Sequence, residues 1–352
     1  MSYISTTINA CPNVQRELTD LFQMESRGLF IEPLPLLEFI TSAANDTNLS
    51  MEVAPGRGKT RTIVARYDQR ISEADVSADQ TNPNCSTGSE VGDMVTNYEI
   101  DITDNEQITK SVTVTDLSPS CVENNLYFNR LFLRMMDALE RKLATKHTAD
   151  LATLNGTWET NVSGVVADQL VVKTLKDSSI DPYPTTYATI DRALRQTGFN
   201  SSVLFGGSLL YDYYRTMQTG CCADNGINLL DQLGMYGKAV IWDKRYESTF
   251  GDDLGTAIQP KSLALLNWTF AGWNAGVDPR FITSNTGYRT VVFGLRTGIP
   301  MDLNVHESSC GSVINVSLTA TTKLVGLPND MFADGDDYDG VTYVNEIKVT
   351  NV

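Results

Sequence analysis

The chain has 352 residues, of which 41% are hydrophobic and 20% are charged, and its formal net charge is −16. This composition is typical of a folded protein with a sizeable core. The negative charge argues against a groove for DNA or a surface for an anionic membrane, because such surfaces are basic. No apolar run approaches the roughly 20 residues that span a bilayer, so no membrane partner is expected.

The N-terminal residues lack a basic stretch followed by an apolar one, so we expect synthesis in the cytoplasm. Six cysteines and two histidines occur without a CxxC pair, which argues against a structural zinc site. Neighbouring Cys221 and Cys222 lie in a loop rich in glycine, aspartate and asparagine. They are free thiols, a redox-active pair or a link between subunits.

A projecting arm is predicted after the first 49 residues, which contain short amphipathic helical pieces. Residues 60–71 and 97–115 alternate between apolar and polar side chains, which predicts two strands. The 25 residues between these segments are mostly polar. Because so long a connection is rare inside a compact domain, we expect an arm that gains its partners from another molecule.

The charges of this arm are segregated. Residues 57–70 contain five basic side chains and one acid, whereas residues 72–107 contain nine acids and no base. These charges can pair across the hairpin within one copy. They can also match charges on a neighbouring copy and so determine which surfaces pair and in which register. The two interpretations are compatible. The candidate assembly residues are Arg57, Lys59, Arg61, Arg66, Arg70, Asp75, Asp79, Cys221 and Cys222.

Residues 120–154 predict one long amphipathic helix. Ser120 and Glu123 form a capping box, no glycine or proline follows until Leu154, and Asn155 with Gly156 provides a stop. Four-residue apolar steps outnumber heptads, so we expect a spine laid across a sheet rather than a coiled coil. The expected core face consists of Phe128, Phe132, Met135, Leu139 and Leu143, while Arg130, Arg134, Arg141 and Lys142 lie mostly on other faces.

The remainder alternates between helices and strands and then becomes mainly β. Expected helices cover residues 185–196, 208–217 and 228–237, and expected strands cover 202–205, 238–242, 262–268, 288–295, 300–307, 312–324 and 341–349.

No segment of the sequence matches a known motif for catalysis, cofactor binding or metal binding. The run Gly56 to Thr60 lacks the first glycine of a P-loop and precedes a strand instead of a helix. The acidic residues 334–340 fail the register of a calcium loop, and no GxSxG or HExxH motif is present. His147 falls on the apolar stripe of the long helix and His306 on an alternating strand. We therefore expect a protein that is not an enzyme.

The order of arm, extended β-loop, spine helix, α/β segment and β-rich return resembles the major capsid protein of tailed double-stranded DNA phages, the Hong Kong 97-type fold. The stretches SSVLFGGSLLYDYY, MYGKAVIWDKRY and GIPMDLNVHE carry the likeness. The resemblance implies an α+β fold. Its expected parts are an N-terminal arm (1–49), an extended β-loop (50–116), a peripheral domain (117–179) containing the spine helix 120–154, an axial domain (180–275) and strands returning to the peripheral domain (276–352).

The resemblance also implies a structural role in the virion. Copies would assemble in the host cytoplasm into hexamers and pentamers of an icosahedral shell that holds DNA by confinement. A separate scaffold, or none, follows from the short N-terminal region, and portal and decoration or minor capsid proteins are further expected partners. One alternative is a phage tail or baseplate protein. The other is a carbohydrate-active β-rich protein, in which the side chains that stack on sugars would be Trp158, Trp242, Trp268 and Trp273.

Overall fold

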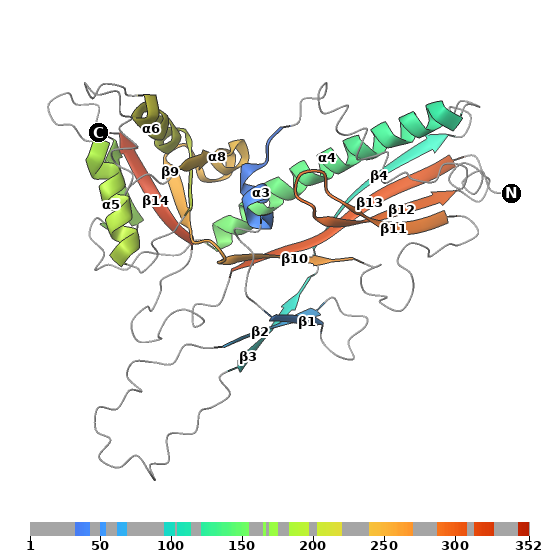
Figure 1. Cartoon of the computed structure of the whole chain (residues 1–352), viewed down its shortest axis with the longest axis horizontal. Helices are drawn as coiled ribbons and strands as arrows, with labels where there is room; N and C mark the ends of the chain where they lie inside the picture. Colours follow the sequence, from blue (N-terminus) through green and yellow to red (C-terminus); the bar gives the residue numbers. More distant parts are fainter. Residues whose placement is uncertain are drawn as a thin grey trace, which may run out of the picture.

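The computed structural model describes residues 32–42, 50–53, 62–68, 95–102, 104–113, 121–154, 165–166, 169–174, 183–196, 203–219, 239–269, 287–307, 313–326 and 344–351. These residues form two large sheets with helices packed against them and a smaller three-stranded sheet (Figure 1). Within these ranges, no helix is both long and apolar enough to cross a membrane.

The longest element is helix α4 (Cys121–Thr153), whose 33 residues give a length of about 50 Å. It lies along a five-stranded antiparallel sheet (Figure 1). The strands of this sheet are β4 (Asn105–Thr113), β10 (Leu263–Trp268), β11 (Gly287–Phe293), β12 (Pro300–Glu307) and β13 (Val313–Gly326). Strand β13 is central, because it pairs with β4, β10 and β12.

Periodicity explains the packing between this helix and this sheet. Along β13, alternate residues from Ile314 to Ala320 are buried, as expected for a strand with one covered face. The apolar stripe of α4 covers that face, so that Leu143 of the helix and Met301 and Val316 of the strands are fully buried in one core. Burial of this core is the main source of stability for this half of the molecule.

A six-stranded mixed sheet forms the other half. Its strands, in spatial order, are β5 (Val165–Val166), β6 (Gln169–Thr174), β14 (Val344–Asn351), β9 (Leu254–Ile258), β7 (Val203–Gly206) and β8 (Val240–Trp242). Helices α5 (Tyr183–Gln196) and α6 (Ser208–Thr219) pack on it, through Ile190 and Leu210 against Leu170 and Ile347. Gly207 permits the turn into α6, because a Cβ there would lie 2.5 Å from the carbonyl oxygen of Gly251.

Two short helices join the halves. Helices α3 (Pro35–Thr41) and α8 (Lys244–Phe250) lie between the sheets (Figure 1). A shared core contains residues from both halves and from both helices: Leu36, Ile40, Leu151, Phe205, Tyr246, Ile258, Leu263 and Leu324. The Asp243 carboxylate caps α8 by accepting from the Arg245 N–H at 2.8 Å, and it also accepts from the Leu36 N–H at 3.3 Å. The first helix is therefore bonded to the second.

The arm differs from the sequence-based prediction. Its sheet has three antiparallel strands, β1 (Ser50–Val53), β2 (Thr62–Asp68) and β3 (Val95–Asp101), instead of two. The predicted second strand, 97–115, divides around residues 102–104, and its second part, β4, pairs with β13 in the five-stranded sheet. The expectation that 97–115 has nothing to pack against is wrong for β4, because Val112 is buried and Ile108 packs on the main core.

Several other elements were not predicted. Strands β5, β6 and β9 and helix α8 are absent from the sequence-based assignment. The last strand, β14, pairs with β6 and β9 in the six-stranded sheet. The expected division of the chain into peripheral and axial parts stays a prediction. The expected helix 228–237, the capping box at Ser120, the glycine-rich run 56–60 and the acidic run 334–340 lie outside the described residues.

Candidate assembly site

The root of the arm is packed against the body of the molecule. Ile100 and Ile102 are 3% and 0% exposed. They share a small core with Ala264, Leu266 and Val325 of strands β10 and β13. Their neighbours Leu263 and Leu324 belong to the core that contains Leu151 of α4. Because successive side chains of a strand point to opposite faces, the arm root and α4 cover opposite faces of the five-stranded sheet.

Polar contacts hold the point where the chain leaves the arm. The Lys323 ammonium donates to the Asp101 carbonyl at 3.1 Å, and the Thr322 N–H donates to the Asp104 carbonyl at 3.3 Å. The Lys146 ammonium of α4 lies 3.4 Å from the Asp104 carboxylate. The arm is therefore fixed at its base by both packing and hydrogen bonds.

One of the predicted assembly residues, Arg66, lies within the part of the chain that the structure describes. Arg66 lies in the middle strand of the arm sheet, opposite Ser50 on β1 and Asn97 on β3. The others, Arg57, Lys59, Arg61, Arg70, Asp75, Asp79, Cys221 and Cys222, lie outside the described residues. Their role in contacts between copies stays a prediction.

The predicted core face of the spine helix lies against the five-stranded sheet. Phe132, Met135, Leu139 and Leu143 are 7% exposed or less, and Phe128 is partly buried against the same core.

The two histidines differ in their surroundings. His147 is 1% exposed, and its ring nitrogens lie 3.0 Å from the Asp150 carboxylate and 2.9 Å from the Thr322 hydroxyl. His306 is exposed on β12, as the alternation of that strand predicts. Asp302 of the same strand is 3% exposed, although the alternation predicts an exposed position. Thus His147 is a buried, hydrogen-bonded residue of α4, and His306 is an exposed residue of β12.

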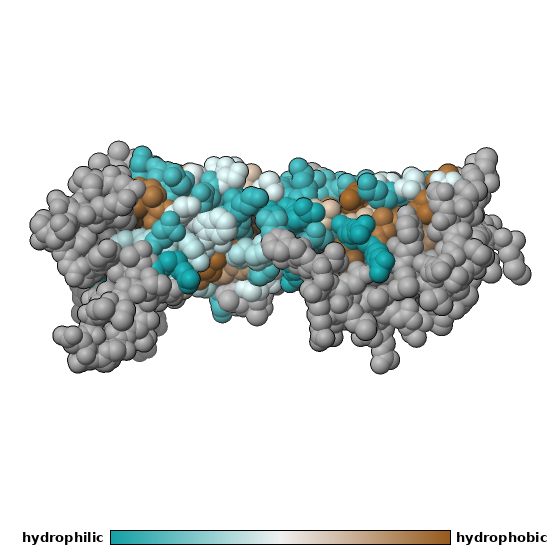
Figure 2. Space-filling model, turned by 90° about the horizontal axis from the view of Figure 1, so that it is seen from above, coloured by the Kyte–Doolittle hydropathy of each residue, from teal (hydrophilic) through white to brown (hydrophobic). Residues whose placement is uncertain are grey.

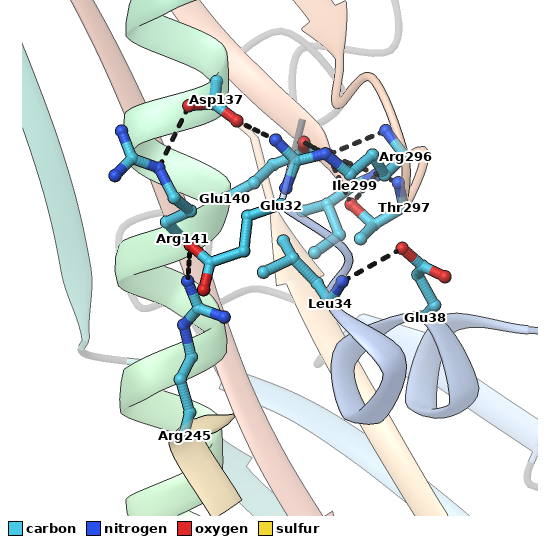
Figure 3. A network of polar contacts seen from close by, with 10 residues as sticks. All are labelled: Glu32, Leu34, Glu38, Asp137, Glu140, Arg141, Arg245, Arg296, Thr297 and Ile299. Carbon is cyan, nitrogen blue, oxygen red and sulfur yellow. Dashed lines mark hydrogen bonds and ion pairs between the residues drawn. The ribbon is translucent and has the colours of Figure 1, made fainter. Parts of the chain in front are cut away.

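A buried carboxylate on α4 forms the centre of a polar network (Figure 3). Glu140 is 0% exposed, and its Oε1 accepts from the Arg296 N–H at 3.1 Å and from the Thr297 hydroxyl and N–H at 3.0 and 3.3 Å. Asp137 accepts from Arg296 and from Arg141, which lies 3.0 Å away. The network joins the spine helix to the turn between β11 and β12.

Burial governs the electrostatics of this network. It raises the pKa of Glu140 above the ordinary value of 4.5, against the opposing effect of the hydrogen bonds from Arg296 and Thr297. Burial likewise lowers the pKa of Arg296, whose side chain is 8% exposed. The Arg296 Nε lies 3.8 Å from the Glu140 Oε2, too far for a hydrogen bond. The pair therefore attracts electrostatically without full hydrogen bonding.

The network also includes the N-terminal segment. The Arg245 guanidinium donates to the Glu32 carboxylate at 3.1 Å, and the Glu38 carboxylate accepts from the Leu34 N–H at 3.3 Å (Figure 3). The sequence analysis missed Glu140 and Arg296. A signal existed, because Glu140 stands between Met136 and Leu143 at the spacing of the buried stripe.

Among the described residues, no group of three or more metal-ligating side chains occurs. Trp242 is 40% exposed, but its indole N–H donates to the Glu247 carboxylate at 2.6 Å and its ring lies 6.4 Å from that of Tyr211. Hydrogen bonds from Ser208 and Trp242 lower the pKa of Glu247, so this carboxylate remains ionised at neutral pH.

Comparisons with known proteins identify the fold. No family model and no curated protein matches the chain. Among solved structures, a chain of the Cyanophage A-1(L) capsid asymmetric unit aligns with a TM-score of 0.53 at 13% identity, covering 91% of this chain and 94% of that one. A chain of Microbacterium phage Oxtober96 gives 0.42 at 11% identity over 92% and 94%. A chain of Mycobacterium phage Adephagia gives 0.40 at 11% identity over 94% and 97%.

Only the first of these three scores exceeds 0.5, and the fold follows from it. The chain has the fold of a phage capsid protein, in which helices and sheets are mixed. The α+β fold of Hong Kong 97 type, predicted from the sequence, is confirmed.

Proposed function

We propose that this protein is the major capsid protein of a tailed double-stranded DNA phage. It assembles into hexamers and pentamers of an icosahedral shell and has no catalytic role. The observation that supports this most is the alignment with a capsid chain over nine-tenths of both chains, 91% and 94%. The arm sheet, fixed at its root and extending away from the body in Figure 1, supports it further.

Assembly follows from the strand edges that each copy presents. In the described part of the arm, β1 and β3 are the edges of the sheet, and β11 is an edge of the five-stranded sheet. Edge strands carry backbone groups that can pair with another chain. Several weak contacts made by each subunit combine into strong association, and a closed shell satisfies every heterologous interface.

The parts of the chain receive roles under this proposal. The five-stranded sheet with α4 serves as the peripheral domain, and the six-stranded sheet with α5 and α6 serves as the axial domain around the symmetry axis of a capsomer. The arm lies on a neighbouring copy, where basic residues 57–70 meet acidic side chains. DNA is enclosed, and scaffold, portal and decoration or minor capsid proteins are the other partners in the virion.

The test combines sedimentation with negative-stain microscopy of the purified full chain, with scaffold supplied. Closed shells are expected. Tubes or rings would favour the tail or baseplate alternative, and single copies that bind oligosaccharides would favour the carbohydrate-active alternative.

A shortened arm tests the mechanism of assembly. Asp68 and Val95 are paired across β2 and β3, so a two-residue Asn-Gly turn can replace residues 69–94 and keep every described strand. Shell formation is expected to be lost while the melting temperature stays unchanged. Deletion as far as residue 110 is unsuitable, because it would remove part of β4 from the core sheet. If the shortened chain still forms normal shells, residues 69–94 are not required for assembly, and the proposed contact of this part of the arm with a neighbouring copy is wrong.

A further inference from the structure

A row of basic side chains runs along the exposed face of α4. Arg130, Arg134 and Arg141 follow one another at steps of four and seven residues, and Lys142 lies beside them. At 1.5 Å per residue, Arg130 and Arg141 lie about 16 Å apart along the helix axis. All four side chains are exposed, and Arg141 is 46% exposed although it pairs with Asp137.

The charge of this row contrasts with the rest of the chain. The protein has 43 acidic and 27 basic residues, yet the described part of α4 from Arg130 to Lys142 has only two acids. Glu140 is fully buried, and Asp137 is bonded to Arg296 and Arg141. Figure 2, seen from above Figure 1, shows hydrophilic side chains over the middle of this side, with smaller hydrophobic areas between them.

The row lies on the side of the sheet opposite the arm. Ile100 and Ile102 of the arm root pack on one face of strands β10 and β13, and α4 covers the other face. In a wall one subunit thick, the arm therefore belongs to one surface and the exposed face of α4 to the other.

We infer that Arg130, Arg134, Arg141 and Lys142 contact the phosphate backbone of double-stranded DNA, and that this face of α4 lines the inside of the shell. The inference rests on the proposed function. Guanidinium and ammonium groups bind phosphate oxygens without reading sequence. An acidic segment of a neighbouring arm is the other polyanion available, but the described root of the arm packs on the face of the five-stranded sheet opposite α4.

The expected contact is weak and sensitive to salt. Neutralising Z phosphates gives a slope of about −0.9Z in log K against log salt, so four cations give about −3.6. Affinity would then fall by a factor of about 150 between 50 and 200 mM salt. The overall negative charge opposes binding further, which keeps packaged DNA free to move.

The experiment measures binding of a short duplex of mixed sequence to the full chain over a series of salt concentrations. A variant carrying Arg130→Gln, Arg134→Gln, Arg141→Gln and Lys142→Gln is expected to lose the salt-dependent binding. A variant carrying Arg130→Lys, Arg134→Lys and Arg141→Lys is expected to keep the slope, because it keeps the charge. Thermal unfolding of each variant establishes that it folds.

The matched control neutralises four exposed cations elsewhere: Arg192→Gln, Arg195→Gln, Lys244→Gln and Lys261→Gln. Arg195 pairs with Asp191 one turn earlier, as Arg141 pairs with Asp137. Equal loss of binding in both quadruple variants, or no binding by the unmodified chain at low salt, would overturn the inference.

Sedimentation of the same samples separates this inference from the proposed function. If the unmodified chain forms no shells, the proposed function fails whatever the DNA result. If the α4 variant binds DNA normally but no longer self-associates, the row contacts a neighbouring copy and the DNA inference is wrong.

Discussion

Glu140 shows how one side chain connects distant parts of this chain. Its carboxylate has no exposed surface and accepts hydrogen bonds from a turn that is 156 and 157 positions away in sequence. A buried carboxylate is costly to ionise unless donors and a cation face it. The turn supplies three donors to one oxygen, and Arg296 supplies the cation. The position of the β11–β12 turn on α4 therefore depends on this residue.

Replacement of Glu140 by Gln is expected to change how stability depends on pH. Because burial raises the pKa of Glu140 above 4.5, the unfolded chain releases this proton at lower pH than the folded chain does. The contribution of this group is therefore fully present below pH 4.5, and it is lost as pH rises through the folded pKa.

Urea unfolding at several pH values measures the effect. The free energy of unfolding of E140Q, relative to the unmodified chain, should increase as pH rises above 4.5. Glu140→Ala is the comparison, since it removes one of the two carboxylates that face buried Arg296 and leaves the donors of the turn without their acceptor. It should destabilise by about 3 kcal/mol. Parallel pH profiles for E140Q and the unmodified chain would contradict the prediction.

Gly294 is predicted to be required beside this carboxylate. A Cβ at this position would lie 2.5 Å from the Glu140 Oε1, so Gly294→Ala must displace a buried and bonded group. We expect a loss of about 1–3 kcal/mol in the free energy of unfolding, measured by urea titration. Gly326→Ala is the control, because its nearest neighbour would lie at an ordinary 3.7 Å. Equal effects at the two positions would show that the contact with Glu140 is unimportant.

At the scale of elements, the chain passes from one sheet to another within a few residues. Strand β3 ends at Asp101 in the arm, and β4 begins at Asn105 in the five-stranded sheet. Ile102 lies between them with no exposed surface. The direction of the arm relative to the body is therefore set by the packing of this short link.

Ile102→Ala is expected to loosen the arm without unfolding the body. The lost packing should cost about 2–4 kcal/mol, felt first in β1, β2 and β3. Amide hydrogen exchange should quicken in those strands and stay slow in β12 and β13. Thr113→Ala, at an exposed position of β4, is the control and should change neither. Faster exchange throughout the molecule would argue against a separately fixed arm.

Sequence patterns predicted the elements whose signal is local. The long helix and the strands β10 to β13 have a period or alternation that reflects one buried face. The division at residues 102–104 could not be predicted, because alternation continues through a strand that changes sheets. Strand β9, with the sequence LGTAI, has little alternation because it lies inside a sheet with four consecutive buried residues.

The site was less predictable than the elements. The sequence shows the basic residues Arg130, Arg134, Arg141 and Lys142 of α4. It does not show that they lie on the side of the five-stranded sheet opposite the arm, because that follows from the packing of the arm root. The partners of Glu140 lie more than 150 residues away, and no local pattern pairs them. The charged residues singled out in the arm belong mainly to segments outside the described residues.

At the scale of the whole molecule, two sheets share one core. Leu36 and Ile40 of α3 pack with Leu151 of the long helix and with Phe205 and Ile258 of the six-stranded sheet. Neither half has this core without the other. We therefore expect the two halves to unfold together.

Leu36→Ala tests this coupling by calorimetry. The unmodified chain should show one main transition, and the variant should show the same single transition at lower temperature, with a loss of about 3 kcal/mol. Thr249→Ala, exposed on α8, should shift it little. Two separate transitions, of which only one moves in L36A, would mean that the halves are independent.

Strand β13 has a mechanical consequence for the subunit. Its 14 residues extend for about 46 Å, with β4 on one edge and β12 followed by β10 on the other. Tension along β13 loads many of its ladder hydrogen bonds in shear at the same time. A sideways pull on β11, in contrast, breaks the hydrogen bonds between β11 and β12 one after another. The subunit should therefore resist stretching along β13 and yield first by peeling at β11.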